Sequence, residues 1–268
     1  MKYLLFTALF AVFTFCPVSH ANLPSSTPNV QALQLMAKLP PELPQRVLGL
    51  AYDGNVFWTT VYLDGRYVTL DPNTLKWSVS TDTKANEAIN EVSGKLKSAA
   101  GICFVNGKLW IAGAYGNSFG SIDPAEWKID RVFKDKQRED PSSQSYSSMA
   151  CDGSHLWIAW HWFRYDLPVS ETQQLLKIDP ETGKVVAVYP LPGGTRVDAT
   201  HGLTWDGTRL WHAKDNRLTS IDPDTGRVID EYKLPLLKRP SGLAWDGHAL
   251  WIIEFDGKVW RLPFLTHH

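Results

Sequence analysis

The sequence predicts an all-β protein, a five-bladed β-propeller made of four-stranded antiparallel blades. Three observations lead to this fold class. A segment that ends in Trp recurs five times, a second turn signature follows four of these segments, and helical periodicity is nearly absent. Internal self-similarity of this length is typical of repeat folds, and the spacing between successive repeats lies in the range of propeller blades.

The first half of each repeat is a predicted β-hairpin. An apolar run leads into Asp-Gly or Asn-Gly, and a second apolar run follows. Both dipeptides tolerate the positive φ that a tight two-residue turn requires. The five hairpins are GLAYDGNVFW (49–58), GICFVNGKLW (101–110), SMACDGSHLW (148–157), GLTWDGTRLW (202–211) and GLAWDGHALW (242–251).

The second half of the repeat predicts two further strands. Asp-Pro opens a turn, and Gly, where present, closes it before the fourth strand. This signature reads LDPNTLK (70–76), IDPAEWK (122–128), IDPETGK (178–184) and IDPDTGR (221–227). A short helix is expected over 86–96, in the connection between the first two blades.

The fifth repeat lacks a fourth strand, because the chain ends soon after its third. Residues 30–40, VQALQLMAKLP, end in the same Leu-Pro as the fourth strands of other repeats. We expect this N-terminal strand to pair with the last blade and close the ring, which leaves no open junction between the first and last blades.

Residues 1–21 have the pattern of a cleaved signal peptide. Lys2 precedes a short apolar run, and Ser19 and Ala21 place small residues where signal peptidase reads the chain. Phe15, before Cys16, disfavours lipidation. We therefore expect cleavage after Ala21, a linker over 22–29, one propeller domain over 30–264, a tail over 265–268, and a periplasmic or secreted protein.

Charge gives no reason to expect a nucleic acid or a membrane surface as partner, since 27 Lys and Arg balance 28 Asp and Glu. No spacing is typical of a zinc or calcium site, so neither a metal nor a cofactor is expected. We expect a monomer without stable membrane insertion. Its partner would be a small molecule, a glycan or another exported protein.

Large and small residues alternate between the two faces of the first strands. Tyr52, Phe104, Cys151, Trp205 and Trp245 lie on one face, and Ala51, Cys103, Ala150, Thr204 and Ala244 lie on the other. Large positions of one blade can fill small positions of the next, so these aromatics and the repeat Trp residues are expected in the core. Cys103 and Cys151 interrupt the pattern with opposite parity in neighbouring blades. They predict either a disulfide or two buried thiols.

Propellers place binding sites at one mouth of the central channel, and polar residues break the repeat at one rim. His201 precedes the fourth repeat, and Lys214 and Glu254 end second strands; these three are candidate acid, base or charge-stabilising groups. His212 is expected to be a buried, hydrogen-bonded histidine. The insertion 161–172 is a candidate lid, or a flap over a blade edge. Candidate ligand-binding residues on this rim are Arg46, Tyr62, Trp160, His161, Trp162, Asp215 and Arg239.

The phrase GLTWDGTRLW, followed by IDPDTGR and a closing Leu-Pro, resembles the repeats of the glutamine cyclotransferase family, the plant-type glutaminyl cyclases and their bacterial relatives. It is also similar to extracytoplasmic propellers with lactonase- or streptogramin-lyase-like repeats. The resemblance covers about residues 45–264 and implies the fold. The cyclase family carries Gln and a catalytic Glu just before its first two Gly-Leu pairs, where this chain has Leu48 and Ala100.

Two function classes follow from these residues. One is an exported binding or scaffold propeller, which fits the missing catalytic Glu and is favoured. The alternative is a cyclotransferase-like or lyase-like enzyme that uses His201, Lys214 and Glu254 at the same rim.

Overall fold

The computed structural model describes residues 27–43, 45–62, 64–80, 83–93, 99–114, 118–134, 144–162, 168, 172–193 and 201–265. It confirms the five-bladed β-propeller of four-stranded antiparallel sheets. Blades 1 and 2 are β3 (Val47–Tyr52), β4 (Phe57–Val61), β5 (Tyr67–Leu70) and β6 (Trp77–Val79), then β7 (Ala99–Val105), β8 (Lys108–Gly113), β9 (Ser118–Asp123) and β10 (Lys128–Lys134).

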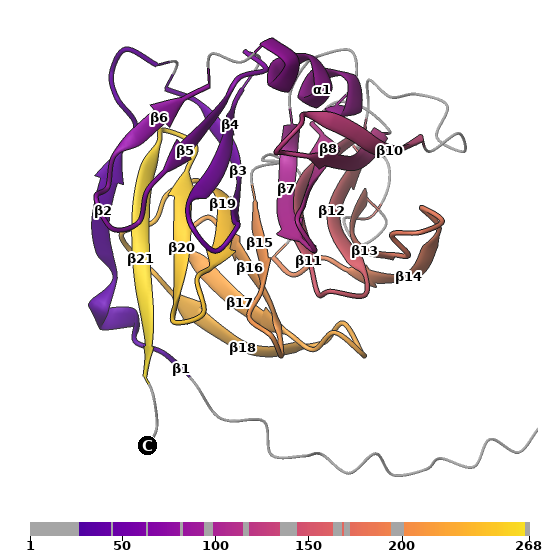
Figure 1. Cartoon of the computed structure of the whole chain (residues 1–268). Helices are drawn as coiled ribbons and strands as arrows, with labels where there is room; N and C mark the ends of the chain where they lie inside the picture. Colours follow the sequence, from indigo (N-terminus) through magenta and orange to yellow (C-terminus); the bar gives the residue numbers. More distant parts are fainter. Residues whose placement is uncertain are drawn as a thin grey trace, which may run out of the picture.

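Blades 3 and 4 have the same strand order, and the C-terminal segment supplies the first three strands of blade 5. Figure 1 shows the first strand of each blade at the centre of the ring. The strands are β11 (Gln144–Cys151), β12 (Leu156–Trp162), β13 (Gln173–Ile178) and β14 (Val185–Pro190); β15 (Gly202–Trp205), β16 (Leu210–Lys214), β17 (Arg217–Ile221) and β18 (Val228–Lys233); β19 (Pro240–Trp245), β20 (Ala249–Glu254) and β21 (Lys258–Leu265).

The ring is closed by the N-terminal segment, as predicted. Strand β2 (Gln34–Lys38) pairs antiparallel with β21, from Gln34 opposite Arg261 to Lys38 opposite Lys258. A 3-10 helix, η1 (Val30–Ala32), precedes it, and β1 (Thr27–Pro28) pairs with the far end of β21. The fourth strand of blade 5 therefore comes from the other end of the chain.

In four blades, the Asp of the Asp-Gly turn between the first two strands has a role beyond the turn. In blade 4, Asp206 follows β15 and its N–H group donates to the carbonyl of Arg209, and Gly207, at φ 100°, begins the two-residue loop. The Oδ1 atom of Asp206 accepts hydrogen bonds from the backbone N–H groups of Thr208 and Arg209, and Oδ2 accepts one from Nε1 of Trp211 at 2.7 Å. The same carboxylate–indole bond joins Asp53 to Trp58, Asp152 to Trp157, and Asp246 to Trp251.

Glycines bring the innermost strands into backbone contact. A Cβ atom on Gly49 would lie 2.9 Å from the carbonyl oxygen of Ala100, and one on Gly242 would lie 2.5 Å from the backbone nitrogen of Leu50. Gly101 and Gly202 touch the next blades in the same way, and blade 3 has Ser148 at this position. These residues, named here the glycine ring, narrow the central channel because only a hydrogen occupies the space of a side chain.

Apolar side chains between neighbouring blades form the core. Strand alternation sends Trp157 and Ala159 of β12 towards blade 4, and Ile158 and Trp160 towards blade 2. Trp110, Trp157, Trp211 and Trp251 are buried, which confirms the expected packing role of these repeat tryptophans, whereas Trp58 is half-buried.

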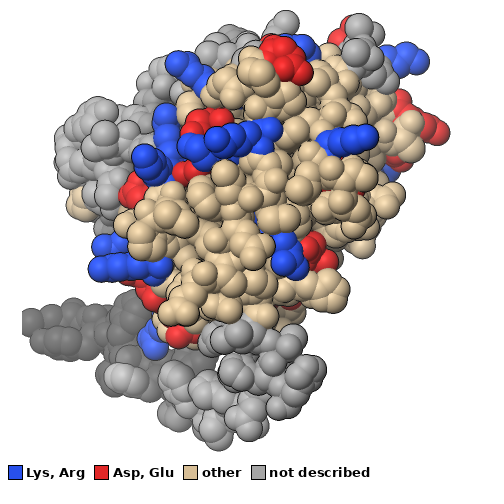
Figure 2. Space-filling view, turned by 90° about the vertical axis from the view of Figure 1, so that its left-hand side faces the viewer, with Lys and Arg blue, Asp and Glu red and all other residues tan. Residues whose placement is uncertain are grey.

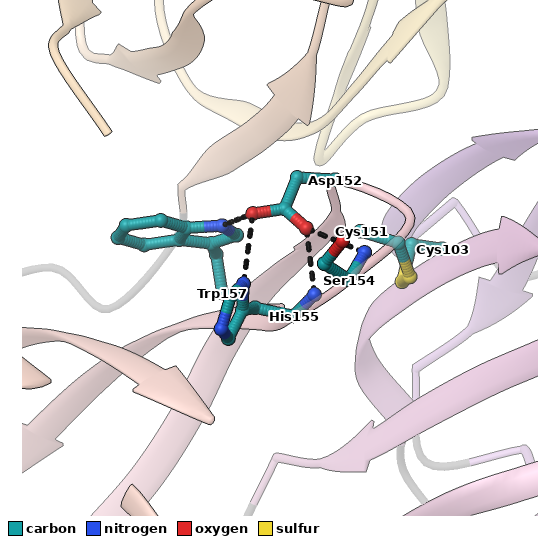
Figure 3. Close-up of a disulfide and its surroundings, with 6 residues drawn as sticks. All are labelled: Cys103, Cys151, Asp152, Ser154, His155 and Trp157. Carbon is teal, nitrogen blue, oxygen red and sulfur yellow. Dashed lines mark hydrogen bonds and ion pairs between the residues drawn. A yellow bond between two sulfur atoms is a disulfide. The ribbon is translucent and has the colours of Figure 1, made fainter. Parts of the chain in front are cut away.

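A disulfide joins Cys103 of β7 to Cys151 of β11, with the Cα atoms 5.9 Å apart. Of the two sequence-based alternatives, the structure has the disulfide. Figure 3 shows it beside the turn in which Asp152 holds Trp157. It covalently links the innermost strands of blades 2 and 3.

The helix between blades 1 and 2 begins earlier than predicted. Helix α1 (Thr83–Ser93) buries Ala85, Ala88, Ile89 and Val92 against the core of blade 2. The expected span of 86–96 starts three residues too late because the apolar positions that anchor the helix begin at Ala85.

No helix in the described part of the chain is long and apolar enough to cross a membrane. On the side of the molecule that carries β2, Lys and Arg residues are interspersed with Asp and Glu (Figure 2). The linker up to residue 26 and the expected signal peptide lie outside the described residues.

Candidate functional site at the loop face

The two ends of the channel differ in their connections. We name the end where β3, β7, β11, β15 and β19 begin the loop face, and the end with the Asp-Gly turns the turn face. Five equivalent residues surround the channel at the loop face, just before the glycine ring. They are Leu48, Ala100, Ser147, His201 and Ser241, and all five are buried.

Three histidines and a lysine converge between blades 3 and 4 near the loop face. Alternation along β16 puts His212 and Lys214 on the side opposite Trp211 and Ala213, which face blade 5. On β12, His161 has the parity of Trp157 and Ala159, which face blade 4. His201 lies between these strands, and we name these four side chains the histidine group.

The members of the histidine group are in direct contact. Nδ1 of His201 lies 2.7 Å from Nε2 of His212, and Nε2 of His201 lies 3.5 Å from Nζ of Lys214. The ring of His161 lies 4.5 Å from that of His201, measured between centroids. A charged lysine only donates, so Nε2 of His201 accepts, and its Nδ1–H group donates to His212.

Burial sets the charge of the group. All four side chains are at most 4% exposed. Burial, together with the positive charge of Lys214, lowers the pKa of His212 to about 3, and both causes lower the pKa of His161 to about 3 as well. These two imidazoles are therefore neutral at neutral pH, when each ring offers one donor and one acceptor.

One nitrogen of the histidine group has an unfilled hydrogen-bonding position. Nε2 of His161 is buried and has no hydrogen-bond partner within the described residues. A buried polar atom without a partner destabilises the fold by about 1–3 kcal/mol, so such an atom calls for an explanation. A bound ligand or water molecule at this nitrogen would supply the missing bond.

Glu254, the third predicted catalytic candidate, has a different place. Its Oε1 atom accepts hydrogen bonds from the backbone N–H groups of Lys238 and Arg239, and Oε2 accepts one from Nε1 of Trp260 at 2.8 Å. It is 2% exposed. The carboxylate thus links the segment that leads into β19 to the side chain of Trp260 on β21.

A second group lies where blades 5 and 1 meet. The guanidinium carbon of Arg239 is 4.1 Å from the ring centre of Phe255, whose ring meets that of Tyr62 edge-on at 5.7 Å. The backbone N–H of Tyr62 donates to the carbonyl of Arg46, so Arg46 joins this group. Arg46 and Arg239 are exposed, whereas the histidine group is buried.

The other candidates are spread between core and surface. The rings of Trp160 and Trp162 lie 6.2 Å apart in the apolar cluster between blades 2 and 3, on the opposite side of β12 from His161. Asp215 is exposed in the β16–β17 turn, where it adopts a φ of 51°. Residues 163–167 and 169–171 of the candidate lid lie outside the described residues.

The sequence predicts His212 as a buried histidine but does not predict that it belongs to the candidate site. It is buried and hydrogen-bonded, as expected. The signal was present in the sequence: His212 and Lys214 are two residues apart on one strand, so they share a face. No group of three or more His, Cys, Asp or Glu side chains among the described residues is arranged to hold a metal ion.

Comparison with known proteins identifies the fold. No family model and no curated protein sequence matches the chain. Among solved structures, it is similar to a streptogramin B lyase, with a TM-score of 0.51 and 13% identity over 87% of this chain and 98% of that one. A mitotic checkpoint complex chain gives a TM-score of 0.47 at 13% identity, covering 93% of this chain and 69% of that one.

Proposed function

We propose that the protein is an exported propeller that binds a small anionic molecule at the histidine group, between blades 3 and 4. The observation that carries this proposal is the ammonium of Lys214, which lies 3.5 Å from His201 and acts electrostatically on His161, whose Nε2 has no hydrogen-bond partner among the described residues. A charge in a water-poor site favours an oppositely charged, hydrogen-bonding partner. A carboxylate would accept from Lys214 and from an Nε2–H group of His161.

Ligand-dependent thermal stabilisation tests this function. Acetate, pyruvate, citrate and inorganic phosphate are each titrated at constant ionic strength, with chloride as the reference anion. At least one should raise the melting temperature with saturation, as mass action requires. Lys214→Met should abolish that response, and Lys238→Met, which changes an exposed lysine, should preserve it. A response that survives Lys214→Met, or no saturable response, contradicts the proposal.

The second candidate function is acid–base catalysis of the lyase or cyclotransferase type at the same group. The contact that favours it is the 2.7 Å bond between His201 and His212. A histidine whose ring is oriented by a second imidazole can accept a proton at its other ring nitrogen, which is what a general base requires. The fold is shared with a streptogramin B lyase, but catalytic residues are not transferred by a fold alone.

Turnover distinguishes the two functions. The protein is incubated with a streptogramin B and with a peptide that has an N-terminal glutamine, and products are followed by mass spectrometry. An enzyme should lose turnover in His201→Ala while keeping its fold. Ligand stabilisation without any product supports the binding function alone.

We also propose that the mature chain begins at Asn22, outside the cytoplasm. The disulfide is compatible with an oxidising compartment. N-terminal sequencing of the protein recovered after expression in a bacterium tests this boundary. A protein that keeps Met1 and fractionates with the cytoplasm would contradict it.

A further inference from the structure

We propose that the anion bound at the histidine group is a small 2-hydroxycarboxylate, and that Gln173 and Thr219 recognise its hydroxyl group. This inference rests on the proposed function and adds the class of ligand. The observation behind it is that polar side chains continue outward from the histidine group, onto the third strands of blades 3 and 4. We name Gln173, Thr219 and the histidine group together the polar seam.

Gln173 belongs to the polar seam because of the register of blade 3. On β13 it lies directly opposite His161 of β12. Directly opposite residues of an antiparallel pair have Cβ atoms about 4.5–5.5 Å apart on the same face. That face is turned towards blade 4, since Leu175, two residues further along β13, packs in the apolar cluster that blades 3 and 4 share. Gln173 is 5% exposed, and its amide can both donate and accept.

Thr219 has the matching place in blade 4. It lies opposite His212 on β17, and Ile221, two residues further along, packs in the same apolar cluster. Thr219 is 4% exposed. The other four blades carry no hydroxyl group at this position, where their residues are Val68, Gly120, Leu176 and Trp260. The hydroxyl is therefore specific to the polar seam and is not a property of the repeat.

The polar seam continues to the surface of blade 4. Glu231 of β18 lies opposite Thr219, and it is exposed, with its Oε1 atom 2.8 Å from Nη1 of Arg217. The residues His212, Thr219 and Glu231 therefore lead from the interior to solvent across three strands without an apolar side chain. A small hydrophilic ligand would find polar contacts along this path.

Two neutral hydrogen-bonding groups beside a buried cation indicate the kind of ligand that fits. Lys214 shares a face of β16 with His212, so its ammonium lies near the pair of His212 and Thr219. A carboxylate at Lys214 and His161 would bring a hydroxyl group on the neighbouring carbon towards Gln173 and Thr219. An acid without this hydroxyl would leave two buried polar side chains facing a C–H group, which lowers its affinity.

A comparison of glycolate with acetate tests the inference in the wild-type protein. Both are two-carbon monocarboxylates that are ionised at pH 7, and they differ in one hydroxyl group. We expect glycolate to bind about 5- to 150-fold more tightly in calorimetry at constant ionic strength, the range for satisfying one buried polar group. Lactate against propionate repeats the comparison with one more carbon and should give a preference in the same direction.

The variants Thr219→Val and Gln173→Met locate the hydroxyl contact. Each nearly keeps the size of the side chain and removes its polar group. Each should weaken glycolate binding by about 5-fold or more and change acetate binding by less than about 2-fold. Thr225→Val, which changes an exposed threonine of the β17–β18 turn, is the matched control and should leave both affinities unchanged.

The outcomes separate this inference from the proposed function. Equal affinities for glycolate and acetate in the wild type would overturn the 2-hydroxycarboxylate assignment and leave the anion site standing. Equal weakening of both acids in Thr219→Val and Gln173→Met would overturn the hydroxyl contact. Loss of both acids in Lys214→Met supports the anion site, and no saturable response to any anion contradicts that site and this inference together. If the variants do not fold, the wild-type comparison of the two acids decides.

Discussion

Nδ1 of His201 lies 2.7 Å from Nε2 of His212 between blades 3 and 4, with both rings at most 1% exposed. This contact makes the histidine group a source of pH dependence. In the folded protein His212 has a pKa of about 3, lowered from 6.5 by burial and by Lys214. Below pH 6.5 the unfolded chain therefore binds a proton that the folded chain does not.

Stability should fall as the pH drops from about 6.5 towards 3, because the unfolded state binds more protons over this range. Replacing His212 by Gln removes this titration while keeping an acceptor for His201. At pH 4.5 the wild type should lose about 2–3 kcal/mol more than His212→Gln, relative to pH 7. Urea unfolding at the two pH values measures the difference. His248→Gln, in an exposed turn, is the control and should behave as wild type.

The carboxylate–indole bonds should contribute to stability blade by blade. In Asp246→Asn, the amide still serves the backbone N–H groups, but its NH₂ group meets the Nε1–H of Trp251 instead of an acceptor. We expect a loss of about 1–3 kcal/mol in the free energy of unfolding. Asp179→Asn, whose carboxylate bonds no indole but only backbone N–H groups and the Thr182 side chain of its own turn, should lose less than half as much. Equal losses would show that the indole bond is unimportant.

Gly242→Ala should prevent the strands from closing the ring. The added Cβ would meet the backbone of Gly49 and Leu50, which cannot move without displacing blade 1. A loss above about 3 kcal/mol or no soluble folded protein is expected, as for overpacking against backbone. Gly207→Ala is the comparison: its φ of 100° is unfavourable for alanine, but no atom lies within 4 Å of the new Cβ. Its loss, measured by urea unfolding, should stay near about 1–2 kcal/mol.

The disulfide should stabilise the ring by constraining the unfolded chain. Cys103 and Cys151 are 48 residues apart, and the chain-entropy relation gives about 4 kcal/mol for a loop of that length. The Cys103→Ala, Cys151→Ala double variant should unfold at a lower urea concentration. Its free energy of unfolding should be smaller than that of the wild type by about 2–4 kcal/mol. Mass mapping without reductant should find the two peptides linked. Free thiols on the denatured wild-type protein would contradict both expectations.

The sequence predicts the propeller well because its evidence is local and repeated. Hairpin turns, Asp-Pro turns and the Leu-Pro of the closing strand each recur, and β2 lies within the predicted segment. The site was harder to predict because it depends on which faces of two blades meet. His201, Lys214 and His161 were candidates, and they converge. The sequence predicts Glu254 at the same rim. Its carboxylate points elsewhere, because it accepts hydrogen bonds from the backbone N–H groups of Lys238 and Arg239.

Other features of the structure lie beyond any single repeat. The Asp-Gly dipeptide predicted a turn, yet its carboxylate also binds a tryptophan five residues away, a contact that turn chemistry alone does not reveal. Likewise, the glycine that opens four of the five repeats gains its meaning only from the neighbouring blade that it touches.

The pairing of β2 with β21 has a consequence for how the molecule is made. Synthesis delivers β2 before any of the blades and β21 after all other strands. Throughout elongation the closing strand has no partner, and blade 1 has no neighbour on one side. The ring gains its final blade only when the last turns emerge, so a chain stopped even thirty residues early would carry two unpaired ends, which are open templates for aggregation.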